Sequence, residues 1–209
     1  MKEIQCFKST YSYLWRFTMT VTKENKIIAR TALEAFGGKP SVSKYWDENN
    51  VSDVDILDAI DRPYDGITAY STIGLSDYSI GYSVDEKPLR IEIVGASDTI
   101  YEFFPNILST CAFNIINTKL PISHGEIFKE VIKMYYPDSE MEHVLFTSPF
   151  IWDKLKTIDF PDKKVTWLLA VPVSTKEFLF AEKEGLEALE TLFENEDIDI
   201  FNLGRNSIL

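Results

Sequence analysis

Histidine and cysteine side chains, which carry much of the nucleophilic and acid–base chemistry of proteins, are scarce in this sequence. The 209 residues include two cysteines, Cys6 and Cys111, and two histidines, His124 and His143. A Ser-His-Asp or Cys-His site needs a histidine base, so such a site would depend on one of these two. His124 precedes an expected helix, where a turn hydrogen bond or a helix cap explains it, and a hydrolase that uses His124 with Glu126 is the catalytic alternative. His143 is expected in an exposed loop and has no assigned role.

Motifs for cofactors and metals are missing from the sequence. The chain has no G-x-G-x-x-G or Walker-type phosphate loop and no G-x-S-x-G nucleophile elbow. Asp53, Asp55 and Asp58 lack the glycine and the terminal glutamate of an EF-hand loop. Two cysteines and two histidines are too few for an obvious structural zinc site. The sequence therefore predicts a protein that is not an enzyme and that binds no cofactor and no metal.

Two further features receive structural interpretations. Cys111 lies in a wide apolar face of an expected helix, so we interpret it as a buried thiol rather than a nucleophile. Arg90 and Glu92 alternate with apolar residues on an expected strand, which predicts an ion-paired face turned toward solvent.

Charge is the first indication of function. Acidic residues outnumber basic ones by 33 to 21, for a net charge of −12. Residues 44–65 carry −5 and residues 177–199 carry −8, so the other 164 residues sum to +1. This balance argues against binding to nucleic acid or to an anionic membrane, because both need clustered lysine and arginine. No apolar run is long enough to span a bilayer or to form a secretory signal, so we expect a cytoplasmic protein that binds another protein.

The elements that position these residues follow from the apolar pattern. Ile28, Ala32, Ala35 and Phe36 predict a helix that Thr20 or Thr22 caps and that the glycines at 37 and 38 end. Alternating or β-branched segments predict strands, and wide apolar faces predict further helices. The predicted strands are 53–60, 67–73, 78–82, 89–94, 144–146 and 166–173, and the predicted helices are 103–118, 126–136 and 182–194. We interpret residues 1–18 as an N-terminal extension from an upstream start site, and residues 19–209 as one domain. The alternative is that the aromatic residues of 1–18 add an edge strand or dock on the domain.

Several segments together resemble the suppressor-of-fused (SUFU) domain family. The resemblance covers residues 23–206 and depends on the order and spacing of the segments. They are Gly66–Ser76, with its glycine, threonine, tyrosine and GLS pattern, Arg90–Ile93, Asn117–Pro121 with His124–Gly125, Leu168–Val173 with Glu177, and Gly185, Leu186, Leu189 and Leu192 with Asp199 and Arg205. The resemblance implies an α/β (α+β) fold, in which a single SUFU-like domain has a mixed, mostly antiparallel sheet flanked by helices.

The resemblance also carries an expectation about function. Within the family, the chain is most similar to small bacterial members that act as immunity proteins. This similarity implies stoichiometric neutralisation of a cognate toxin, of the LXG type with a basic nuclease domain. Clustered carboxylates would match such a surface and accelerate the encounter. The animal relatives, which regulate transcription factors, leave open a second hypothesis of a scaffold that sequesters another protein partner.

Two acidic groups are the candidate contacts for this partner. Carboxylates on a strand are held more firmly than those on a helix surface, so they pair with an arginine at lower entropic cost. Acidic residues on the outer face of a helix are expected to steer the partner at longer range. The expected contacts are Asp53, Asp55, Asp58 and Asp61, and the expected steering residues are Glu187, Glu190 and Glu194.

Overall fold

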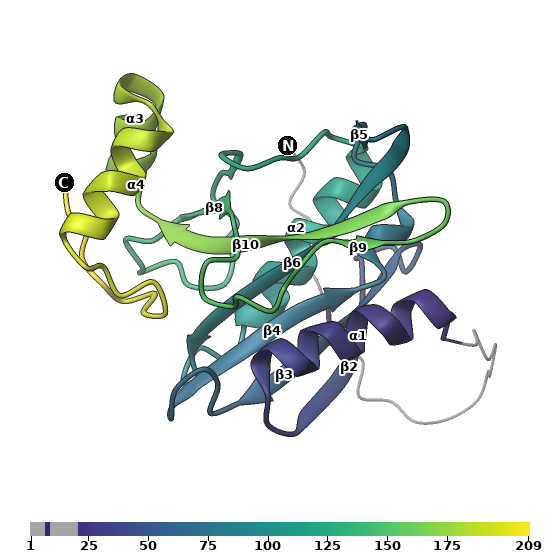
Figure 1. The fold of residues 1–209 in the computed structure, drawn as a ribbon. Coiled ribbons are helices and arrows are strands. Elements are labelled where there is room, and N and C mark those ends of the chain that lie inside the picture. The colour runs from purple at the N-terminus through teal and green to yellow at the C-terminus, as the bar shows by residue number, and fades with distance from the viewer. Residues whose placement is uncertain (1–6, 9–20) are drawn as a thin grey trace.

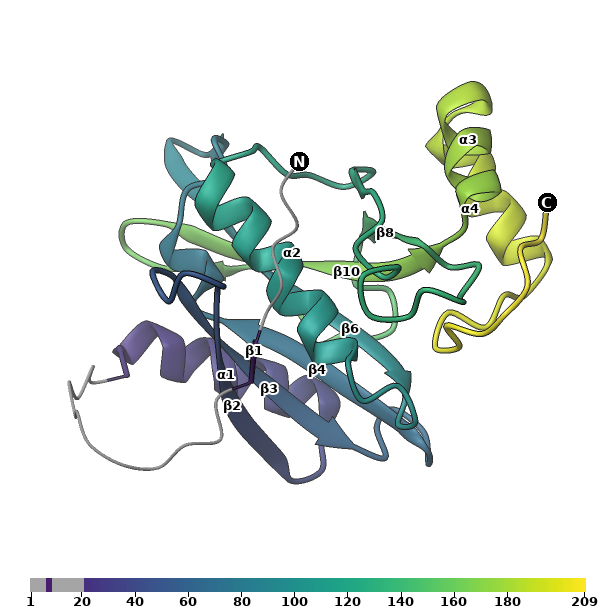
Figure 2. The same cartoon turned by 180° about the vertical axis from the view of Figure 1, so that it is seen from behind.

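A central sheet with helices on both faces organises the computed structural model, which describes residues 7–8 and 21–209 (Figures 1 and 2). The strand order is β1-β2-β3-β4-β6-β10-β8-β7, with β5 paired to β6 and β9 paired to β10. Every pair is antiparallel except β6 with β10, which confirms the predicted mixed, mostly antiparallel sheet. The strands are β1 (Phe7–Lys8), β2 (Pro40–Trp46), β3 (Asp53–Ile60), β4 (Ile67–Ile73), β5 (Ser83–Val84), β6 (Lys87–Asp98), β7 (Ile127–Phe128), β8 (His143–Thr147), β9 (Ile158–Asp159) and β10 (Lys164–Val173). The helices are α1 (Lys23–Phe36), α2 (Phe104–Thr118), α3 (Thr175–Glu184) and α4 (Leu186–Asn195), with a 3-10 turn at Leu75–Asp77.

Helix α1 forms where the sequence predicts it. The Thr22 side chain accepts a hydrogen bond from the backbone N–H of Asn25 at 3.0 Å, so Thr22 is the N-cap. The helix ends at Gly37, whose φ of 75° lies in the region that favours glycine. Ile28, Ala32 and Phe36 form the buried stripe.

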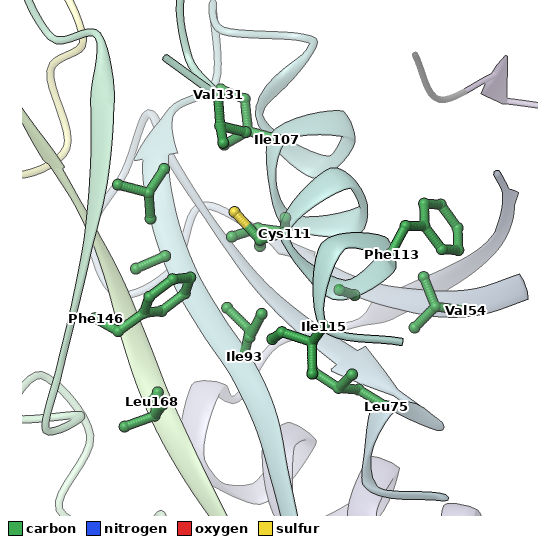
Figure 3. Close-up of a cluster of buried hydrophobic side chains, with 14 of the residues drawn as sticks. Val54, Leu75, Ile93, Ile107, Cys111, Phe113, Ile115, Val131, Phe146 and Leu168 are labelled. Carbon is green, nitrogen blue, oxygen red and sulfur yellow. The ribbon is translucent and has the colours of Figure 1, made fainter. Parts of the chain in front are cut away.

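Two apolar cores fill the two faces of the sheet. Helix α2 packs on one face, where Cys111 and its apolar neighbours are fully buried against strands β6 and β10 (Figure 3). Helix α1 covers the other face, where its buried stripe packs in one core with Trp167 of β10 and the apolar side of α4. The buried position of Cys111 confirms its structural interpretation, and burial raises the pKa of its thiol.

The predicted helix at residues 126–136 is wrong. Residues 127 and 128 form strand β7 beside β8, and the chain then turns. The backbone N–H of Glu130 donates to His143 Nδ1 at 2.8 Å, and that of Ile132 donates to the Glu142 carbonyl at 3.1 Å. Glu130 has a φ of 59°, which interrupts a helix. These two backbone donors therefore bond to the neighbouring segment instead of to the preceding turn.

Two other predicted elements also differ. The predicted helix at 182–194 is divided at Gly185, whose φ of 94° ends α3 and begins α4. The predicted strand at 78–82 is absent from the described chain, because only Ser83 and Val84 pair with β6 beyond the 3-10 turn.

The N-terminal boundary stays a prediction. Residues 7 and 8 form strand β1, which pairs with Trp46 and Tyr45 of β2 at the edge of the sheet. The rest of the proposed extension, residues 1–6 and 9–18, lies outside the described residues.

Candidate partner-binding surface

The four predicted contact residues on and after β3 do not form one patch. Asp53 and Asp55 lie on one face of the strand and both pair with Lys44 of β2, Asp55 at 3.1 Å. Partial burial lowers the pKa of Lys44, but its hydrogen bonds to the two carboxylates outweigh this effect and raise that pKa overall. Both carboxylates therefore already have a cation as a neighbour.

The other two predicted contacts lie elsewhere. Asp58 projects from the opposite face of β3, accepts a hydrogen bond from Ser41 Oγ at 2.6 Å and lines a cavity of about 630 Å³ near Glu102. Asp61 lies in the turn before β4, with a φ of 56°, and accepts the backbone N–H of Gly66 at 2.9 Å.

The predicted steering residues on α4 lie beside a larger groove of about 850 Å³, which we call the α4 groove. Glu190 and Glu194 line it, whereas Glu187 is exposed on the same helix outside the lining. Three of the described lining residues are carboxylates and none is a lysine or an arginine. The lining comprises Tyr64, His124, Leu145, Thr147, Ser148, Phe150, Ile151, Val171, Glu190, Phe193, Glu194, Asp197, Ile198, Ile200 and Phe201.

The carboxylate of Glu190 is held in place by two groups from outside its helix. Thr147 Oγ1, at the end of β8, donates a hydrogen bond to Glu190 Oε1 at 2.8 Å. His124 Nε2 lies 3.3 Å from the same oxygen. The acidic neighbour of His124 is therefore Glu190, and not Glu126 as in the catalytic alternative. Glu190 is thus more fixed than the sequence predicted for a residue on a solvated helix face.

No sequence pattern predicted the aromatic side chains in the groove. Phe150 and Tyr64 are 63% and 65% exposed at its rim, and the rings of Tyr64 and Phe201 meet edge-on with centroids 6.2 Å apart. The only sequence signal was the position of two large aromatic residues in turns, after Pro149 and within Pro63–Gly66.

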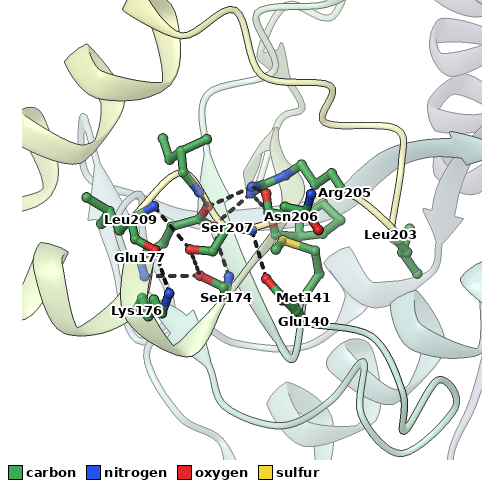
Figure 4. Close-up of polar contacts among 12 residues, drawn as sticks. Glu140, Met141, Ser174, Lys176, Glu177, Leu203, Arg205, Asn206, Ser207 and Leu209 are labelled. Atoms are coloured by element: carbon green, nitrogen blue, oxygen red, sulfur yellow. Dashed lines mark hydrogen bonds and ion pairs between the residues drawn. The ribbon is translucent and has the colours of Figure 1, made fainter.

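A buried ion pair connects the C-terminal segment to α3, next to the helix α4 that lines the groove. Arg205 binds Glu177 through two hydrogen bonds, of 2.6 Å and 2.8 Å, at the N-terminus of α3 (Figure 4). Glu177 also accepts the backbone N–H groups of Ser174 and Ile208 and completes a capping box with Ser174. The Arg205 guanidinium lies 5.7 Å from the ring of Phe193 of α4. The C-terminal segment, α3 and α4 are therefore joined at one point.

Two polar residues have different surroundings from those predicted. His143 is buried on β8, where Nδ1 accepts the Glu130 N–H and Nε2 lies 3.0 Å from Thr175 Oγ1. Its position on β8, 4% exposed, contradicts the expectation of an exposed loop, and the same burial lowers the pKa of His143. Glu92 is also fully buried and makes no ion pair with Arg90 in the described structure, which contradicts the predicted solvent-facing pair.

The described part of the chain has neither a candidate metal cluster nor a candidate membrane-spanning helix. Within it, no three His, Cys, Asp or Glu side chains gather where they could hold a metal ion. None of its helices is long and apolar enough to cross a membrane.

Comparison with known proteins places these features in a family. The sequence model described as "Suppressor of fused protein (SUFU)" matches residues 50–206. A protein of Bacillus subtilis (strain 168) named "Immunity protein YqcF" is 52% identical over 192 residues, which are 91% of this chain and 100% of that protein. The chain belongs to the suppressor-of-fused family.

Solved structures of suppressor-of-fused proteins share the fold. A homologue from Neisseria gonorrhoeae FA 1090 is 18% identical, with a TM-score of 0.57 over 99% of this chain and 88% of that one. A chain in the Sufu–Fu complex is 13% identical, with a TM-score of 0.61 over 87% of this chain and 91% of that one. The predicted resemblance and fold class are thereby confirmed.

The segments that resemble the suppressor-of-fused family build the frame of this domain. Thr72 Oγ1 donates to Glu92 Oε2 at 2.6 Å, and the backbone N–H groups of Gly74 and Ser76 donate to Oε1 at 2.9 and 3.1 Å. The Gly74–Ser76 segment therefore donates hydrogen bonds to the buried carboxylate of Glu92 on β6. Glu177 and Arg205, also part of the resemblance, form the ion pair described above.

Proposed function

We propose that this protein is an immunity protein that neutralises a cognate toxin by stoichiometric binding, and that the toxin is of the LXG type with a nuclease domain. The observation that carries the proposal is the 52% identity to Immunity protein YqcF over that protein's full length. The proposed site of action is the cytoplasm of the producing cell.

The charge distribution supports a basic partner. A nuclease must present cationic groups to its phosphate substrate. Carboxylates concentrated in residues 44–65 and 177–199 complement such a surface and increase the rate of encounter at low salt. Neutralisation of this kind is occlusion, in which the immunity protein performs no reaction. The proposal therefore assigns no catalytic role to His124.

Co-expression tests the proposal. We expect the neighbouring gene to encode a long secreted toxin, whose C-terminal domain should kill cells when expressed alone. Expression of this protein should restore growth, and the two chains should co-purify in equal amounts. A toxin that still kills at full expression of this protein would refute the proposal. Capture of a different protein by the same bait would instead support the scaffold hypothesis.

A further inference from the structure

The α4 groove combines exposed aromatic rings with carboxylates, and no lysine or arginine is among its described lining residues. Phe150 and Tyr64 stand exposed at the rim, while Phe193 is buried in the floor. Exposed apolar surface with a polar rim marks an interaction site on a protein surface. The three carboxylates of the lining, within a segment of net charge −8, make a cationic occupant the complementary one.

Resting on the immunity role proposed above, we infer that the α4 groove is the short-range binding site for the toxin and that it accepts an arginine flanked by apolar side chains. A guanidinium can stack on an aromatic ring while its N–H groups bind a carboxylate, whereas an ammonium makes no planar stack. Phe150 and Tyr64 supply rings, and Glu190, Glu194 and Asp197 supply carboxylates.

Glu190 is organised for this contact before the partner arrives. Thr147 and His124 both contact Oε1, which fixes the carboxylate and leaves Oε2 to accept a hydrogen bond from the partner. A side chain that is already ordered loses little entropy on binding. Asp53 and Asp55, in contrast, must exchange the Lys44 ammonium for the new cation. The structure thus favours the opposite of the sequence-based assignment, with direct contact at α4 and longer-range steering at β3.

Binding kinetics with the toxin's C-terminal domain, inactivated by substitution of a catalytic residue, test the inference. The groove variant combines Glu190→Gln, Glu194→Gln and Asp197→Asn. Its matched control removes the same charge from exposed positions of α3 and α4 outside the groove. That control combines Glu182→Gln, Glu184→Gln and Glu187→Gln. The groove variant should dissociate at least about 10-fold faster, while the control should mainly lose association rate, by less than about 3-fold, at low salt.

A second pair of variants separates binding from folding. Phe150→Ala removes an exposed ring of the groove, and Leu179→Ala removes an exposed side chain of α3 outside it, 53% exposed. Both should melt at the parental temperature, and Phe150→Ala alone should weaken binding by about 10-fold or more.

The outcomes distinguish the inference from the function on which it rests. If the parental protein does not bind the toxin domain, the immunity role itself is refuted. If the parent binds and both groove variants dissociate at the parental rate, the groove is refuted while the immunity role stands. Faster dissociation of Asp53→Asn with Asp55→Asn, with the groove variants unaffected, would likewise overturn the inference in favour of the β3 contacts.

Discussion

Replacement of Arg205 by methionine should destabilise the whole domain. The Glu177 carboxylate is 0% exposed and the Arg205 side chain 7%, and their two hydrogen bonds are both shorter than 3 Å. Methionine keeps much of the apolar volume but leaves a buried carboxylate whose remaining donors are two backbone N–H groups, those of Ser174 and Ile208. The domain therefore loses the cation that compensated the burial of Glu177.

The size of the effect follows from this burial. Removal of one partner of a buried ion pair costs about 3–5 kcal/mol, against less than about 1 kcal/mol for an exposed pair. With a urea dependence of roughly 2 kcal/mol/M, the unfolding midpoint should fall by about 1.5–2.5 M. Lys183→Met provides the control, because Lys183 and Glu184 form an exposed pair. Its midpoint should change by less than about 0.5 M.

Urea unfolding followed by circular dichroism measures both shifts. The double variant Glu177→Gln with Arg205→Met removes both charges, so it should be less destabilised than the sum of the two single changes. A fall below about 0.5 M for Arg205→Met would show that the pair contributes no more than a surface contact, and would refute the reasoning.

Three further predictions concern pH and the chain terminus. Burial raises the pKa of Glu92 despite the hydrogen bonds that it accepts, so the native state takes up a proton before the unfolded state does as pH falls. The parent should therefore gain stability relative to Glu92→Gln between pH 7 and pH 5 in urea titrations, and a constant difference would contradict this. Burial lowers the pKa of His143, so the unfolded state is protonated first and stability is lost as pH falls below the ordinary value of 6.5. An NMR titration of the His143 ring should give a midpoint below 6.5, and a higher value would contradict the buried neutral imidazole. Deletion of residues 1–18 removes the two-residue strand β1 and is expected to leave the melting temperature nearly unchanged in calorimetry, whereas a large fall would place this segment in the core.

Local patterns in the sequence predicted most elements because their causes are local. The Thr22 cap, the Ile28–Phe36 stripe and the β-branched run of β4 each depend on neighbouring residues. The segment at 126–136 has a helical composition, but the backbone N–H groups of Glu130 and Ile132 bond to residues 142 and 143, which no local pattern records. Gly185 could have indicated the break between α3 and α4, because glycine favours the positive φ found there.

The candidate surface was harder to predict, because distant segments build it. Aspartates that are close in sequence on β3 diverge in space, since alternate residues face opposite sides of the sheet. Glu190 meets Thr147 and His124 only after β8 and α4 are placed side by side. The backbone N–H groups of a turn 16 to 18 residues earlier donate hydrogen bonds that compensate the burial of Glu92. The alternating pattern of a single strand does not record these bonds.

Among the described strands one pairing is parallel, and it affects the order of events in folding. Strand β10 lies between β6 and β8, and its residue Lys164 pairs with Leu89, which was synthesised 75 residues earlier. Until β10 joins them, β6 and β8 have no shared neighbour, so the sheet exists as two unjoined parts. Contacts between such distant segments slow folding. Under the immunity role proposed above, a newly made chain would protect the cell only after this folding step. The order in which this protein and the proposed toxin are made would then matter as well as the affinity between them.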